Sequence, residues 1–347
     1  MFLLLSMMLM AQDLPPFYED KAHLLSYQAP AGESHAVRTR EDWALRRRHI
    51  LENFQQVAGP MPGEDRRVPL DLRVEEETAT PKYLRRRISF AVEAGDRLPA
   101  WLLLPLKRAD KAPAVLCLHP THPRGKDVVV IPGLEANRDY AHELAERGFV
   151  ALAPDYPGFG DYKIDAYAMG YASATMKGIW NHRRCVDLLQ SLPEVDPERI
   201  GCIGHSLGGH NTLFAGLFDE RIKAMVSSCG FCSFPTYYQG NLTGWTHKGY
   251  MPRIDTTYHK DPKKMPFDFT EVLAALAPRP LFVNAPLHDD NFDAGGVRDC
   301  LQAAQPVYAL FNAAERLTAL HPDCGHDFPP EARNAAYAVL DAALRPQ

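Results

Sequence analysis

The 347-residue sequence lacks an excess of basic residues, a long apolar segment and an even set of cysteines. It has 38 lysines and arginines against 43 aspartates and glutamates, a net charge of −5, so it lacks the basic footprint of a nucleic-acid-binding protein. No apolar run reaches the roughly 20 residues that span a bilayer as a helix. Seven cysteines, an odd number in a long chain, argue against a disulfide framework.

Repeats and low-complexity tracts are absent as well. The composition, 46% hydrophobic and 23% charged, is typical of a globular protein, and the length allows one large domain or two ordinary ones. Cys229 and Cys232 form a C-x-x-C pair, but a second ligand pair and a thioredoxin-like context are missing. We therefore expect these cysteines to be structural.

The first eleven residues, Met1 to Ala11, are nearly all apolar and are too short to cross a bilayer. They resemble the apolar region of a signal peptide cleaved after Ala11, although no lysine or arginine precedes them and Leu9 suits the −3 position poorly. A mis-assigned start codon or a frayed terminus is the alternative. The pattern slightly favours a secreted or periplasmic protein over a cytoplasmic one.

The rest of the chain divides into an N-terminal extension, residues 12–80, and one catalytic domain, residues 81–347. Residues 17–58 show helical spacing that Gly59-Pro60 ends, and a period of two over residues 68–106, across the boundary, predicts three strands at 68–77, 83–93 and 98–106. Beyond residue 112, apolar strands alternate with helices, which predicts an α/β fold with a mostly parallel sheet and helices on both faces. The strands are expected at 114–119, 150–155, 199–204, 224–229, 281–285 and 317–320, and the helices at 137–147, 179–192, 207–217 and 330–344.

One connection, residues 231–269, is long and has no clear periodicity. Long structured loops in compact domains are usually functional. We expect this insertion to form the wall of a substrate pocket through its aromatic side chains. The candidates are Phe231, Tyr237, Tyr238, Trp245 and Tyr250.

A nucleophile is predicted at Ser206, in the G-x-S-x-G segment of residues 204–208. The predicted strand 199–204 ends just before it and a predicted helix begins just after it. A strand-to-helix turn this tight strains the serine backbone and exposes its hydroxyl at the helix N-terminus, and the glycines on either side avoid clashes. A glycine-rich turn with an incidental serine is the alternative.

A serine hydroxyl needs an adjacent base in order to attack a carbonyl carbon. In this kind of fold the acid follows the serine in the chain and the histidine comes last. The loop after the strand 281–285 offers both Asp289 and Asp290. Only His321 and His326 follow, and we favour His326 because it lies in a glycine-bearing loop before the final helix.

The developing oxyanion needs two backbone N–H donors. Leu207, directly after the nucleophile, is one candidate. The other is Thr121 in the loop after the strand 114–119, because Pro120 and Pro123 have no N–H. The alternative, a metal site at His119 and His122, lacks helical spacing and an evident third ligand.

The chain resembles the α/β-hydrolase superfamily, in particular its dienelactone hydrolases, acetyl xylan esterases and prolyl-oligopeptidase-like domains. The resemblance covers roughly residues 85–345 and rests on the segments LCLHPTHPRG, LAPDYPGFGDY, RIGCIGHSLGGH, PLFVNAPLHDDNF and DCGHDF. It implies a triad of Ser206, an acid and His326, and no cofactor. The family places the acid a few residues after its strand, which favours Asp289 over Asp290. Pro120 stands where relatives often have glycine, and a serine replaces the cysteine of true dienelactone hydrolases.

Together these observations predict a serine hydrolase that cleaves a small-molecule carboxylic ester through an acyl-enzyme, with no metal, nucleic-acid partner or membrane span. Three alternatives stay open. A serine peptidase of the prolyl-oligopeptidase type would use the same triad, a binding protein would keep the fold without catalysis, and a metal hydrolase would use His119 and His122.

Overall fold

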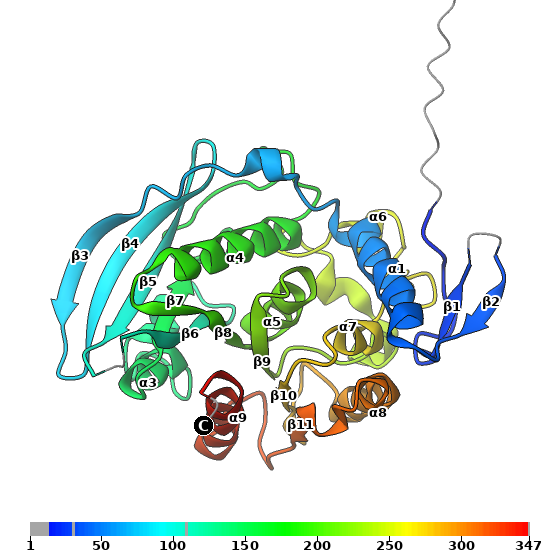
Figure 1. Ribbon diagram of the computed structural model, residues 1–347. Coiled ribbons are helices and arrows are strands. Elements are labelled where there is room, and N and C mark those ends of the chain that lie inside the picture. Colours follow the sequence, from blue (N-terminus) through cyan, green and yellow to red (C-terminus); the bar gives the residue numbers. More distant parts are fainter. Residues whose placement is uncertain (1–13, 30–31, 108–109, 346–347) are drawn as a thin grey trace, which may run out of the picture.

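The computed structural model describes residues 14–29, 32–107 and 110–345 of the chain (Figure 1). The candidate signal peptide, Met1 to Ala11, lies outside these residues. No described helix is both long and apolar enough to cross a membrane.

A nine-stranded sheet organises the fold, in the order β11-β10-β9-β8-β6-β7-β5-β4-β3. The six strands from β11 to β7 run parallel, and β5, β4 and β3 continue the sheet as antiparallel neighbours. This confirms the predicted mostly parallel α/β sheet. The strands are β3 (Arg73–Ala79), β4 (Tyr83–Glu93), β5 (Asp96–Pro105), β6 (Ala112–Leu118), β7 (Val150–Pro154), β8 (Val195–His205), β9 (Ile222–Ser228), β10 (Leu281–Asn284) and β11 (Leu317–Leu320).

Helices cover both faces of the sheet (Figure 1). Side chains alternate between the faces, as in β6, where Val115 and Cys117 belong to one core and Leu116 and Leu118 to the other. The helices α4 and α5 pack on one face and α3 and α9 on the other. The principal helices are α1 (Arg40–Ala58), α3 (Tyr140–Glu146), α4 (Ala174–Ser191), α5 (Leu207–Phe218), α7 (Phe269–Ala275), α8 (Ala294–Leu310) and α9 (Pro330–Leu344), and α2 (Asp127–Val130) and α6 (Arg253–Thr256) are single turns.

The N-terminal part differs from its prediction. The helix predicted over residues 17–58 begins only at Arg40, after a capping box of Thr39 and Asp42, and the short strands β1 (Ser26–Gln28) and β2 (Ser34–Ala36) precede it. A buried ion pair between Arg46 and Glu271 ties α1 to α7. The boundary expected between residues 80 and 81 falls between β3 and β4, which pair within the same sheet.

Candidate active site

Ser206 lies in the tight turn between β8 and α5. Its backbone has φ 54° and ψ −115°, a strained conformation for a residue with a side chain. The flanking glycines are needed because a Cβ on Gly204 would approach the Gly208 carbonyl oxygen to 2.2 Å, and one on Gly208 would approach the Leu118 carbonyl oxygen to 2.0 Å. The strand–turn–helix context predicted for the G-x-S-x-G segment is thus present.

A second turn packs directly against this one. The backbone N–H of Ser206 donates to the carbonyl of Ser228 at the end of β9, over 2.8 Å. Beyond it, a Cβ on Gly209 would lie 2.8 Å from the Gly230 Cα, and one on Gly230 would lie 2.6 Å from the Gly209 carbonyl carbon. The two turns therefore touch backbone to backbone with no side chain between them.

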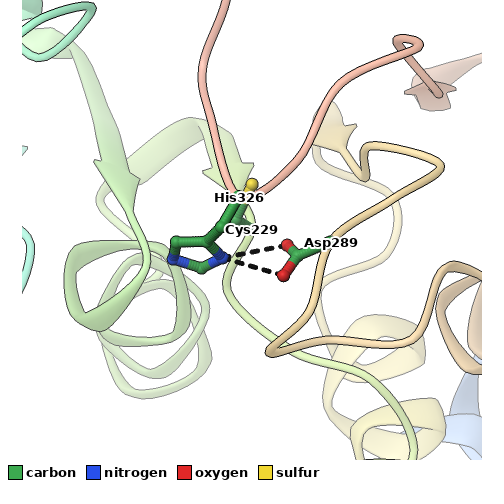
Figure 2. A group of neighbouring side chains, drawn as sticks. All are labelled: Cys229, Asp289 and His326. Atoms are coloured by element: carbon green, nitrogen blue, oxygen red, sulfur yellow. Dashed lines mark hydrogen bonds and ion pairs between the residues drawn. The ribbon is translucent and has the colours of Figure 1, made fainter.

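His326 and Asp289 meet at the carboxyl edge of the sheet (Figure 2). His326 Nδ1 lies 2.9 Å from Oδ1 and 3.0 Å from Oδ2 of Asp289. Since a carboxylate only accepts, Nδ1 carries the hydrogen, which leaves Nε2 of the neutral ring as an acceptor. The Asp289 side chain is 1% exposed and that of His326 is 25% exposed, so the carboxylate is shielded while the imidazole is accessible.

The surroundings of Asp289 favour its charged form. Burial alone would raise the pKa of this carboxyl, but its hydrogen bond with His326 and the backbone N–H groups of Phe292 and Asn291 outweigh burial and lower the pKa. The neighbouring Asp290 is exposed and forms no hydrogen bond or ion pair with any described residue. Of the two adjacent aspartates, the structure brings only Asp289 to His326.

The His326 ring packs between His205, 4.9 Å away between ring centroids, and Phe292, 6.0 Å away. No hydrogen bond joins its Nε2 to Ser206 Oγ, and catalytic contacts of this kind often tighten only when substrate binds. The other candidate histidine, His321, is hydrogen-bonded through Nδ1 to the Ala285 carbonyl over 2.7 Å. The structure therefore brings His326, and not His321, to Asp289.

Cys229 adjoins this pair (Figure 2). Its sulfur and the ligand atoms of Asp289 and His326 all lie within 4.8 Å of one another. Metal binding requires the thiolate, whereas burial raises the pKa of the Cys229 thiol well above its usual value. The thiol also donates to the Asp327 carbonyl over 3.3 Å. The group therefore fits a metal poorly.

The loop after β6 is held by polar contacts. His119 donates from Nδ1 to the Pro120 carbonyl over 2.7 Å and accepts the Tyr156 N–H at Nε2 over 2.9 Å. Both ring nitrogens are occupied, so His119 is not available as a metal ligand. Further along, the buried Lys126 ammonium lies 2.6 Å from the buried Asp155 carboxylate and fixes the end of the loop.

A cavity of about 160 Å³ opens beside Ser206. No charged residue lies among its lining side chains. The lining residues are Thr121, Ser206, His210, Tyr237, Gly244, Trp245, Tyr250, Asn291 and Phe292. A larger groove of about 620 Å³, lined by Pro278, Arg279 and Val339 among others, contains none of the predicted site residues.

Of the residues predicted to form the pocket wall, Tyr237, Trp245 and Tyr250 line this cavity, whereas Phe231 and Tyr238 do not. Phe231 is 1% exposed and stacks on Phe269, with 5.3 Å between ring centroids, so it belongs to the hydrophobic core. Tyr238 is 55% exposed and donates to the Asn291 side chain over 3.4 Å from outside the cavity. Adjacent aromatic residues in the sequence thus face different environments.

Four lining residues were not predicted: His210, Gly244, Asn291 and Phe292. Asn291 and Phe292 directly follow Asp289 and Asp290, and the pattern of this loop pointed only to the two carboxylates. His210 is four residues after Ser206, one helical turn along α5, so it returns to the side of the nucleophile. This four-residue spacing is the feature of the sequence that could have predicted a position for His210 at the site.

Comparisons with known proteins show that the chain is similar to several hydrolases. The family model described as "Glucuronyl esterase, fungi" matches residues 162–312. "Putative hydrolase YtaP" of Bacillus subtilis is 27% identical over 286 residues, which are 79% of this chain and 91% of that protein. The "4-O-methyl-glucuronoyl methylesterase" of Hypocrea jecorina is 30% identical over 165 residues, 43% of this chain and 35% of that protein.

The chain is also similar to a peptidase and to an esterase of known structure. "Dipeptidyl-peptidase 5" of Porphyromonas gingivalis is 25% identical over 214 residues, 59% of this chain and 30% of that protein. The solved glucuronoyl esterase from Solibacter usitatus superposes with a TM-score of 0.71 at 20% identity, covering 94% of this chain and 98% of that one. At this identity, the structural likeness concerns the fold.

Proposed function

We propose that this chain, an α/β-hydrolase that cleaves carboxylic esters by a serine mechanism, acts on the ester of a uronic acid. The match to the glucuronyl esterase model over residues 162–312 supports this substrate class. That region includes Ser206, Asp289 and most residues that line the cavity. The observation that carries the proposal is the uncharged, aromatic cavity beside Ser206.

In the proposed mechanism, Ser206 Oγ attacks the ester carbonyl while His326 Nε2 takes its proton. Asp289 holds the imidazole in the required tautomer and stabilises the imidazolium that forms. The backbone N–H groups of Thr121 and Leu207 stabilise the oxyanion. His326 then returns the proton to the departing alcohol, and a water molecule hydrolyses the acyl-enzyme by the same steps in reverse order.

The cavity also distinguishes an esterase from a peptidase that recognises a chain terminus. A peptide's terminal ammonium or carboxylate needs an opposite charge when it is desolvated. None of the residues that line the cavity is an aspartate, glutamate, lysine or arginine. A uronate ester is neutral because its carboxyl group is esterified, so it suits this lining better.

The proposal is tested with three substrates: the methyl ester of methyl glucuronoside, p-nitrophenyl acetate and a dipeptidyl p-nitroanilide. We expect the wild type to hydrolyse both esters and to prefer the uronate. Ser206→Ala should lower kcat on the uronate by about 10⁶-fold, as loss of the nucleophile does in serine hydrolases. A fluorophosphonate should label Ser206, which mass spectrometry of the labelled peptide checks.

Two results would contradict the proposal. A higher kcat/KM for the anilide would favour the peptidase, and a wild type inert on every substrate and unlabelled by fluorophosphonate would favour a binding protein. The matched control is Ser233→Ala. Ser233 is buried and lies outside the cavity lining, so this variant should retain activity and labelling.

A further inference from the structure

The base of the proposed mechanism, His326, lies in residues 321–329, which form neither helix nor strand between β11 and α9. Loops are mobile unless other contacts hold them, whereas a catalytic side chain must be held to within roughly 0.5 Å of its productive position. The next residue, Asp327, supplies such contacts. Its carbonyl oxygen and its carboxylate are bonded by side chains from two different parts of the chain.

The carbonyl oxygen of Asp327 accepts a hydrogen bond from Asn284 Nδ2 over 2.9 Å. The same nitrogen donates to Ser228 Oγ over 2.8 Å, and Ser228 Oγ lies 2.9 Å from His205 Nδ1. His205, Ser228 and Asn284 are the last residues of β8, β9 and β10, where they are register partners, and all three are buried. Because His205 directly precedes Ser206, this row of side chains joins the turn of the nucleophile to the backbone of the loop that carries the base.

Asn284 suits this position because of its amide nitrogen. A carbonyl oxygen only accepts, so the group that faces the Asp327 carbonyl must be the –NH2. The Oδ1 atom of the same amide is buried and has no hydrogen-bond partner among the described residues, an arrangement that costs stability. A leucine at this position would avoid that cost but would lose both donated hydrogen bonds. These two bonds are therefore what Asn284 contributes.

The loop before α3 holds the carboxylate of Asp327. Arg138 Nη1 lies 2.6 Å from Oδ1, and Asn137 Nδ2 donates to Oδ2 over 2.7 Å. Arg138 Nη2 also donates to the His326 carbonyl over 3.3 Å, so one guanidinium bonds to both residues. Burial alone would raise the pKa of Asp327, but the hydrogen bond from Arg138 helps to lower it and keeps the carboxylate charged. The Arg138 side chain is only 12% exposed, so water competes little for these bonds.

We propose that Asn284 and Arg138 are positioning residues that hold His326 where it can exchange a proton with Ser206. Each acts through the backbone or the side chain of residues 326 and 327, and neither lines the cavity. This inference rests on the proposed function, because it takes Ser206 as the nucleophile and His326 as the base. It does not depend on the uronate, since the base acts in the same way on any ester.

The test measures kcat on p-nitrophenyl acetate. Asn284→Leu and Arg138→Met should each lower kcat by about 10²-fold, the loss that a misplacement of about 1 Å can cause. Arg138→Lys keeps a charge for Asp327 but has no second arm for the neighbouring carbonyl, so it should keep more of kcat than Arg138→Met. The rate at which a fluorophosphonate labels Ser206 should fall in parallel, because the same base activates the serine.

The decisive readout is the same pair of substitutions in a chain that lacks the base. The effects of residues that act as a unit are not additive, so Asn284→Leu and Arg138→Met should hardly lower the residual kcat of His326→Ala. A purely structural role would instead lower kcat by the same factor with and without His326. The residual rate is measured at high enzyme concentration.

The chain offers a matched control for each residue. Arg184 on α4 also bonds to a carboxylate and to a backbone carbonyl, but both partners lie outside residues 321–329. Asn53 on α1 is buried like Asn284, and its Nδ2 also donates to a backbone carbonyl, over 2.9 Å. Arg184→Met and Asn53→Leu should retain kcat at a temperature at which thermal melting shows that they are folded.

Unchanged kcat in folded Asn284→Leu and Arg138→Met would overturn the inference. So would an equal loss with and without His326, or a comparable loss in both controls. If Asn284→Leu does not fold, Arg138→Met decides the outcome by itself. Full activity in Ser206→Ala or His326→Ala would contradict the proposed mechanism instead, because these two variants test it without changing Asn284 or Arg138.

Discussion

Two histidines adjoin Ser206, and their partners differ. His326 gives its Nδ1–H to the Asp289 carboxylate and is 25% exposed on its side chain. His210 gives its Nδ1–H to a backbone carbonyl and is almost completely buried. A carboxylate stabilises a protonated imidazole, whereas a carbonyl in a buried site does so weakly. The same side chain is therefore suited to carry a proton in one position and to remain a fixed acceptor in the other.

The largest expected effect comes from giving His326 a neutral partner like that of His210. Asp289→Asn should keep the shape of the loop but remove the charge that fixes the tautomer and stabilises the imidazolium. In a triad of this kind, the loss in kcat is about 10⁴-fold. Steady-state kinetics on the uronate ester measures it.

Asp290→Asn is the matched control, since Asp290 is the adjacent aspartate and makes no contact with His326. Its loss should be about tenfold or less, the scale of an ordinary change in an exposed loop. A large loss in Asp290→Asn with a small one in Asp289→Asn would reverse the assignment of the acid.

A second prediction concerns the histidines that stay neutral. Burial lowers the pKa of His49 to about 4 and those of His182 and His210 to about 3, against about 6.5 in the unfolded chain. Between pH 6.5 and 4 the unfolded chain therefore binds protons that the folded protein does not bind. The free energy of unfolding should fall as the pH falls through this range, by up to about 1.4 kcal/mol per pH unit for each fully shifted histidine.

Urea denaturation of the wild type and His182→Leu from pH 7 to pH 4.5 measures this dependence. The variant should show a flatter decline below pH 6.5, whereas His288→Gln, which alters an exposed ring, should follow the wild type. Parallel curves for the wild type and His182→Leu would show that His182 does not contribute to acid unfolding.

The last prediction is that removing metal ions has no effect on activity. EDTA should leave ester hydrolysis unchanged, because His119 uses both ring nitrogens in hydrogen bonds and Cys229 keeps a protonated thiol. Dialysis against EDTA followed by kinetics, with and without added Zn²⁺, measures it. Loss of activity on chelation that Zn²⁺ restores would contradict the proposed roles of Ser206 and His326.

Much of the parallel sheet was predictable because its central strands are short apolar runs buried on both faces; the strand predicted at 150–155, for example, is β7, Val150–Pro154, with all five residues buried. The helix α8 was missed because Gly295, Gly296 and Pro306 are unfavourable within helices. Its stability comes from packing on α7, which the sequence pattern does not reveal.

The active site shows the same difference between residues that the sequence pattern reveals and residues whose role depends on packing. Ser206 and His326 are identified by their positions after strands, where the chain must turn at the carboxyl edge. His210 and Phe231 could not be assigned in this way, because a buried histidine or phenylalanine has the same local pattern whether it lines a cavity or fills a core. Only the packing of residues 231–269 against α5 separates the two cases.

The contact between Gly209 and Gly230 has a consequence for how this protein can change over evolutionary time. The turn that carries Ser206 and the turn from which the insertion 231–269 departs meet backbone to backbone, so neither can accept a side chain without displacing the other. Substitutions beyond Gly230 can reshape the cavity while this junction holds the nucleophile in place. We therefore expect new substrate preferences to arise through changes in the insertion while these two positions remain glycine.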